Sequence, residues 1–84
     1  MSSETEIRQI ICETLNIPGE QVRPDTHIRS LPNVESILIL NIILHAEKRF
    51  GIEVPDDVTF RVETVGEFIG LVDDLRAAQA AQAA

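Results

Sequence analysis

The sequence of 84 residues is poor in cysteine, in basic side chains and in long apolar segments. Cys12 is the single cysteine, so an intrachain disulfide framework is impossible and a reducing compartment is the natural setting. Only 7 Lys and Arg stand against 14 Asp and Glu, and the net charge of −7 repels phosphate backbones and makes nucleic acid an unfavourable partner. No apolar run is longer than four residues, which is too short for membrane insertion.

The length predicts one small domain. A chain of this size buries only about 60–65% of the surface that its unfolded form exposes, which leaves no room for a deep catalytic cleft. The first residues, Met1 to Glu6, lack the basic region and the apolar stretch of a signal peptide. We therefore expect a cytoplasmic monomer, and the acidic balance favours encounters with basic patches on other proteins.

Helical spacing and capping signals predict a first helix from Ser3 to Leu15. Ser3 and Glu6 match a capping box, and apolar residues then recur at the helical period at Ile7, Ile10, Ile11 and Leu15. The connection from Asn16 to Glu35 is long and contains three prolines. It carries apolar anchors at Ile17, Val22, Ile28 and Leu31, so we expect a loop packed across one end of a bundle, with a short helical turn near Ile28.

The segment from Ser36 to Phe50 is predicted to be a second helix. Its β-branched residues would also suit a strand, but fifteen residues suit a helix better. Lys48 and Arg49 fall in the last turn and Gly51 follows, as expected at a helix C-terminus.

The rest of the chain predicts an extended link, a short helix and a long last helix. Ile52 to Pro55 is the link, and Asp56 and Asp57 are candidate caps for a helical turn that ends near Val62. Thr64 and Glu67 form a second capping box, followed by a stripe at Val65, Phe68, Ile69, Val72 and Leu75. The predicted fold is all-α: an antiparallel four-helix bundle of three main helices and one short helix, without a sheet. It spans residues 1–76, and the Ala/Gln tail 77–84 either frays or extends the last helix.

Residues that could support catalysis or metal binding are scattered. His27 and His45 lie in different segments, and no second cysteine joins them as a metal ligand. Cys12 is interpreted as a small buried apolar residue. Asp56 and Asp57 lack the alternating ligands of an EF-hand loop. We therefore predict no catalytic residue, no metal site and no enzymatic activity.

Ser36 stands where a proline-containing loop meets the long apolar helix. A serine near a helix N-terminus commonly caps backbone amides, and this is the simplest interpretation. The same position also suits a phosphodiester on the hydroxyl, which would face the free N–H groups and the positive end of the helix dipole. Spacing alone favours the cap.

Two motifs carry a family resemblance. The stretch from Leu31 to Ile37 resembles the L-G-x-D-S-L attachment motif of acyl carrier proteins, and Glu47 to Asp56 resembles their E-E-x-F-G-I-x-I-P-D segment. The resemblance covers about Glu6 to Leu75. It implies a four-helix fold with a 4′-phosphopantetheine arm on Ser36, installed from coenzyme A by a phosphopantetheinyl transferase. Acyl groups would be held on the arm as thioesters, sheltered between the helices and presented to acyl-transferring, synthase or ligase enzymes of fatty-acid, lipid or polyketide-type biosynthesis.

The chain departs from the family motif at three positions: Asn33 replaces Gly, Glu35 replaces Asp and Ile37 replaces Leu. Asn33 still tolerates a left-handed backbone, whereas Glu35 is a poorer N-cap than Asp.

The second helix departs further, because it is apolar on nearly every side. Leu38 and Asn41 occupy positions where the family places acids on the face that docks enzymes. The core can take Ile39, Ile42, Ile43 and Ala46. We predict a partner-binding surface made of Glu35, Ile37, Leu38, Leu40, Asn41, Leu44 and Glu47, which suits a specialised carrier docked through apolar contacts. The alternative is a set of scattered exposed apolar residues without function.

Two other functions remain open from the sequence. The first is an aminoacyl or peptidyl carrier, with the same arm and a different cargo. The second is a carrier-like structural subunit in which Ser36 serves as a helix cap.

Overall fold

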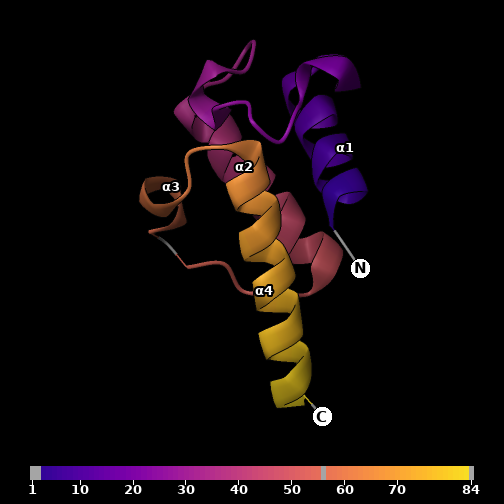
Figure 1. Cartoon of the computed structure of the whole chain (residues 1–84). Helices are drawn as coiled ribbons and strands as arrows, with labels where there is room; N and C mark the ends of the chain where they lie inside the picture. The colour runs from indigo at the N-terminus through magenta and orange to yellow at the C-terminus, as the bar shows by residue number, and fades with distance from the viewer. Residues whose placement is uncertain (1–2, 56, 84) are drawn as a thin grey trace.

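The computed structural model describes the backbone of residues 3–55 and 57–83, and the side chains of these residues other than 59, 60 and 80–83. Within this part, the structure is helical and has no strand beyond one isolated bridge between His27 and Thr64. The elements are α1 (Glu4–Leu15), the 3₁₀ turns η1 (Gly19–Gln21) and η2 (Ile28–Ser30), α2 (Ser36–Phe50), α3 (Val58–Arg61) and α4 (Val65–Ala83). Figure 1 shows α1, α2 and α4 as the main helices, with α3 short and to one side. The predicted all-α fold is confirmed.

The start of α1 lies where the sequence predicts it, but the predicted capping box is wrong. Ser3 is fully buried, and its side chain makes no capping hydrogen bond to α1. Its hydroxyl instead donates to Asp73 Oδ1 at 2.7 Å and accepts a hydrogen bond from Arg76 Nη1 at 2.8 Å. Hydrogen bonds to charged groups are stronger than neutral ones, so α4 outcompetes the first turn of α1 for this hydroxyl.

The long connection between α1 and α2 is anchored as predicted. Val22 and Leu31 are buried, Ile17 and Ile28 pack partly against the core, and η2 forms at the expected turn. Backbone hydrogen bonds fasten this loop to the segment that enters α4: Ile28 N to Glu63 O, Val65 N to Thr26 O and Gly66 N to Pro24 O, at 2.8–2.9 Å. The turn η1 was not predicted, because Gly19–Gln21 carries no apolar periodicity.

The two glycines of α4 are expected to respond to alanine with opposite signs. A Cβ on Gly66 would lie 2.8 Å from Pro24 O, whereas one on Gly70 would meet nothing within 4 Å. Gly66→Ala should therefore lower the free energy of unfolding by about 1–3 kcal/mol, as overpacking does. Gly70→Ala should raise it by about 0.4–1 kcal/mol, because alanine restricts the unfolded chain. Urea unfolding of both variants checks this pair, and equal shifts would contradict the close contact at Pro24.

The second helix directs one side into the core. Ile42 and Ala46 are buried, and Ile39 and Ile43 are half-buried. The helix ends at Gly51, which adopts the left-handed φ of 65° and donates its N–H to Glu47 O. Because α2 runs from Ser36 to Phe50, the helix prediction and its C-terminal stop are confirmed. Residues four apart lie on one face of a helix, so Ile42 and Ala46 enter the core together.

The predictions for the last third of the chain are partly confirmed. Asp56 lies outside the described residues; Asp57 is at the N-cap of α3 but makes no capping hydrogen bond with its side chain. At α4, Glu67 N donates to Thr64 Oγ1 at 3.1 Å, as the second capping box predicts. The predicted stripe faces the core: Val65, Phe68, Ile69 and Val72 are buried, and Leu75 is partly buried.

The Ala/Gln segment extends α4, which continues to Ala83. Gln79 of this segment binds the link that follows α2. Its side chain accepts a hydrogen bond from Glu53 N and donates one to Glu53 O, both at 3.0 Å. An amide side chain can satisfy both polar groups of an extended residue, which is how the link after α2 is held. Among the described helices, none is long and apolar enough to cross a bilayer.

Candidate functional site

Ser36 is the first residue of α2, and its side chain is exposed. The N-cap position belongs to Glu35, whose backbone is extended and whose side chain makes no capping hydrogen bond. Within the described part of the chain, the Ser36 hydroxyl has no hydrogen-bond partner. The capping interpretation of Ser36 is therefore wrong: Glu35 holds the N-cap position, Ser36 is the first helical residue, and its side chain is exposed.

The loop before Ser36 is held in a fixed shape. Asn33 takes the left-handed φ of 64° that was expected at this position, and its Nδ2 donates to Leu15 O at 3.0 Å. Leu31 is buried, and Val34 N donates to Leu31 O at 3.3 Å. These contacts tie the approach to Ser36 to the end of α1. The serine is thus presented on an ordered turn and not on a free loop.

The N-terminal turn of α2 suits an anion. The first amides of a helix have no intrahelical acceptor, and no side chain caps them here. The first turn also contains no acidic residue. A phosphodiester on Ser36 would therefore meet unpaired N–H groups and the positive end of the helix dipole. The exposed serine and the uncapped first turn together fit a 4′-phosphopantetheine group.

The predicted partner-binding residues fall into two groups. Ile37, Leu40 and Leu44 are exposed, with 64%, 54% and 51% of their surfaces accessible. Leu38 is half-buried against the core, because it lies between the exposed side of α2 and the buried one. Asn41 is also half-buried, and Glu35 is exposed beside the serine.

Glu47 has a structural partner within the chain. Its Oε2 accepts a hydrogen bond from Val54 N at 2.8 Å, so this carboxylate holds the extended link that follows α2. The side chain is half-buried. Its place in a partner-binding surface stays a prediction, and sequence reasoning missed its role in fixing the link.

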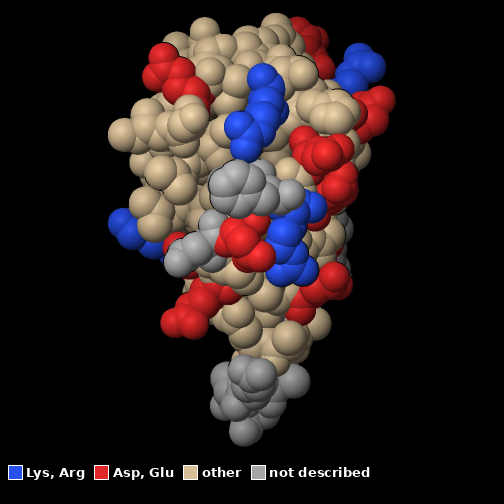
Figure 2. All heavy atoms as spheres, turned by 90° about the vertical axis from the view of Figure 1, so that its left-hand side faces the viewer, with Lys and Arg blue, Asp and Glu red and all other residues tan. Residues whose placement is uncertain are grey.

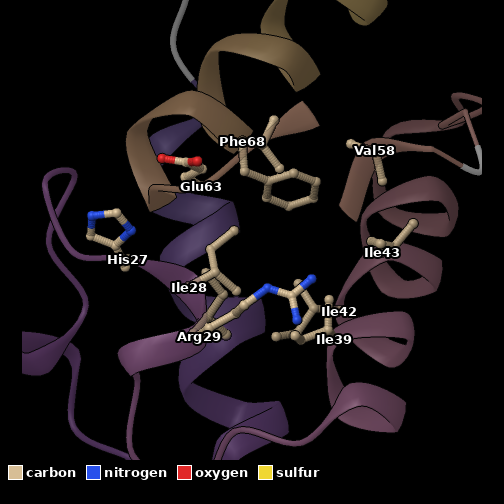
Figure 3. A pocket seen from close by; sticks show the side chains of 11 residues that line it. His27, Ile28, Arg29, Ile39, Ile42, Ile43, Val58, Glu63 and Phe68 are labelled. Carbon is tan, nitrogen blue, oxygen red and sulfur yellow. The ribbon is translucent and has the colours of Figure 1, made fainter. Parts of the chain in front are cut away.

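An apolar cavity of about 360 Å³ opens between the helices. Figure 3 shows Phe68 of α4 and Ile28 of η2 facing α2 across it. The lining residues come from each helix and from the loops: Ile11, His27, Ile28, Arg29, Ile39, Ile42, Ile43, Val58, Val62, Glu63 and Phe68. Ile39 lies one turn after Ser36, so the cavity begins close to the exposed hydroxyl.

His27 belongs to the cavity lining, and its backbone pairs with Thr64; His45 is exposed on α2. Cys12 is half-buried beside the core. Across the described residues, no group of three or more His, Cys, Asp or Glu side chains could hold a metal ion. None of these residues lies on the exposed turn with Ser36.

Comparisons with known proteins agree with this geometry. Residues 5–72 match the family model described as a phosphopantetheine attachment site. The acyl carrier protein of Helicobacter pylori strain G27 is 28% identical over 69 residues, which cover 82% of this chain and 88% of that protein. The acyl carrier protein of Acidothermus cellulolyticus is 29% identical over 68 residues, which cover 81% of each chain. The chain therefore belongs to the acyl carrier protein family, whose members carry phosphopantetheine.

Proposed function

We propose that this chain carries acyl groups as thioesters on a 4′-phosphopantetheine arm attached to Ser36, and that it catalyses no reaction itself. The observation that carries the proposal is the exposed, unpartnered hydroxyl of Ser36 at an uncapped helix N-terminus. When bound, the arm supplies a thiol on a long flexible tether. The residues of the chain position the attachment point. The proposed partners are a phosphopantetheinyl transferase, which installs the arm, and acyl-transferring, synthase or ligase enzymes of fatty-acid, lipid or polyketide-type biosynthesis.

The cavity supports an acyl cargo over an aminoacyl one. Eight of its lining residues are Ile, Val or Phe, and they come from α1, α2, α3, α4 and the loops around them. Removing an alkyl chain from water into such a site is favourable by about 0.8 kcal/mol for each buried CH₂. Glu63 is the one acidic residue of the lining and it is exposed, so a charged amino group placed among the Ile, Val and Phe side chains would lose its hydration at a cost. Apolar cargo is the better match.

The proposal predicts that an octanoyl cargo enters the cavity. A transferase that accepts acylated coenzyme A can install an octanoyl arm or an alanyl arm on Ser36, and methyl NMR can then compare the two products. We expect the octanoyl form to shift the methyl signals of Ile28, Ile43 and Val58 relative to the unacylated form. The alanyl form should leave these signals unchanged, because its short polar cargo stays in water.

A matched pair of substitutions tests whether the cavity itself is responsible. Ile43 lines the cavity and is half-buried, whereas its neighbour Leu44 is exposed outside it. Ile43→Phe should reduce the octanoyl-dependent shifts at Ile28 by filling space, and Leu44→Phe should leave them as in the wild type. Equal shifts for the octanoyl and alanyl forms, or equal effects of both substitutions, would contradict an acyl-sheltering role.

A further inference from the structure

A tight turn directly precedes the segment that leads into Ser36. Val34 N donates to Leu31 O at 3.3 Å, so Pro32 and Asn33 are the two central residues of this turn. The ring of Pro32 presets a negative φ, and Asn33 takes the left-handed φ of 64°, which is the combination found in a type II turn. The conformation of this turn therefore sets the direction in which the chain enters α2.

The side chain of Asn33 ties the turn to α1. Its Nδ2 donates to the backbone oxygen of Leu15, which is the last residue of α1. A carbonyl in the last turn of a helix has no intrahelical donor, so Asn33 satisfies a group that α1 leaves open. Leu15 is 2% exposed and belongs to the core. The bond therefore joins the turn to a firmly packed part of the bundle.

This bond is a feature of the present chain and not of the family motif. The motif has glycine at the position of Asn33, and glycine has no side chain that could donate to α1. Glycine also adopts a left-handed backbone more readily than asparagine does, so the turn alone gives no reason for asparagine. What Asn33 adds is the donor.

We propose that Asn33 is a positioning residue for attachment of the arm, because its bond to Leu15 fixes the turn and thereby the direction of the Ser36 hydroxyl. The inference rests on the proposed function. In the described structure the hydroxyl has no hydrogen-bond partner of its own, so its position depends on the backbone that carries it.

The chemistry of arm attachment is sensitive to this position. The Ser36 Oγ forms a bond to the phosphorus of coenzyme A that bears pantetheine, and the bond from this phosphorus to adenosine 3′,5′-bisphosphate breaks. The hydroxyl proton passes to a base supplied by the transferase. Displacing a reacting atom by about 1 Å can slow such a step by about 10²-fold. A turn that moves relative to α1 would displace the Oγ in this way.

Single-turnover kinetics of arm transfer test the role of Asn33. The probe is the phosphopantetheinyl transferase of the cell that makes this chain, in excess and saturated with coenzyme A. The readouts are the rate constant at saturation and the transferase concentration that gives half of it. Asn33→Gly keeps the left-handed turn and removes the donor. It should lower the saturating rate constant about tenfold and leave the half-saturating concentration unchanged, because the bound geometry is altered and the binding is not.

Asn16→Gly is the matched control for this substitution. Asn16 and Asn33 are the two non-glycine residues with a left-handed backbone in the described part of the chain, and both are exposed. Asn16 has a φ of 58° and makes no hydrogen bond through its side chain within that part. The same exchange at this position removes no donor, so arm transfer should proceed at the wild-type rate.

Asn33→Asp separates the donor from the shape of the side chain. Aspartate has nearly the shape of asparagine and tolerates a left-handed backbone, but its carboxylate accepts hydrogen bonds only. Its added charge is a small change for a chain with a net charge of −7, whose acidic side chains appear at several places on the face shown in Figure 2. Asn33→Asp should therefore be as slow as Asn33→Gly.

Thermal melts distinguish positioning from a purely structural role. A structural role would lower the melting temperature and leave the saturating rate constant of the folded protein unchanged. Wild-type rate constants in folded Asn33→Gly and Asn33→Asp proteins, or an equal loss in Asn16→Gly, would overturn the inference and leave Ser36 as the attachment residue. A wild-type chain that the transferase never modifies would overturn the proposed function, and this inference with it.

Discussion

Replacing Ser36 with alanine is expected to abolish attachment of the arm completely while leaving the fold intact. The Ser36 hydroxyl has no hydrogen-bond partner in the described structure, so its removal leaves no polar group unsatisfied. Alanine is a better helix former than serine, and substitutions at exposed positions without such partners usually change stability by less than about 0.5 kcal/mol. Intact mass after co-expression with the transferase, together with a thermal melt, measures both effects.

Ser30 is the matched control for this substitution. It is also exposed, but it lies in η2 and not at the N-terminus of a long helix. Ser30→Ala should accept one phosphopantetheinyl group as the wild type does. A Ser36→Ala protein that still gains this mass, or one that unfolds, would show that the hydroxyl at position 36 does not have the role assigned to it.

Replacing Phe68 with alanine is expected to have the largest effect on stability. Phe68 is 2% exposed, is the largest fully buried side chain among the described residues and borders the apolar cavity. Truncating a buried Phe costs about 3–5 kcal/mol, because apolar surface is lost and the enlarged cavity cannot collapse fully. The whole domain has about 4–13 kcal/mol at typical values per residue, so this single change removes a large part of it.

Urea unfolding of the Phe68→Ala protein measures this loss as a lower midpoint with an unchanged slope. Ile37→Ala is the control, because it also truncates a large apolar side chain, but one that is 64% exposed. Its midpoint should stay close to that of the wild type. Similar midpoints for both variants would contradict the burial of Phe68 in the core.

The helices were predictable because each one repeats a local physical pattern. In α4, the apolar residues recur every three or four positions and pack against the rest of the bundle as expected. Gly51 ends α2 because its left-handed backbone costs glycine little, and Asn33 takes the same conformation before Ser36. Such features depend on neighbouring residues alone, so the sequence contains the information needed to find them.

Contacts between distant segments could not be predicted in the same way. Ser3 looked like a cap, but it is bound by Asp73 and Arg76, which are about 70 positions away. No local pattern indicated that Gln79 would bind the backbone of Glu53. In both cases, the fold brings together polar groups that are distant in the sequence.

The candidate site was predictable in part. Motif resemblance pointed to Ser36, whereas spacing alone favoured a cap that the structure does not contain. The exposed face of α2 followed from its excess of apolar residues, and the structure leaves Ile37, Leu40 and Leu44 accessible. Leu38 was less predictable because it lies at the boundary of the two faces. The resemblance implied shelter between the helices, but the residues that line the cavity could not be predicted, since they come from segments throughout the chain.

Peptide mapping by tandem mass spectrometry of the wild-type chain, after co-expression with the transferase of its own cell, tests the central claim most directly. The account predicts one phosphopantetheinyl group per chain, located on the peptide that contains Ser36. A chain that stays unmodified under these conditions, or one that carries the group on any other residue, would contradict it.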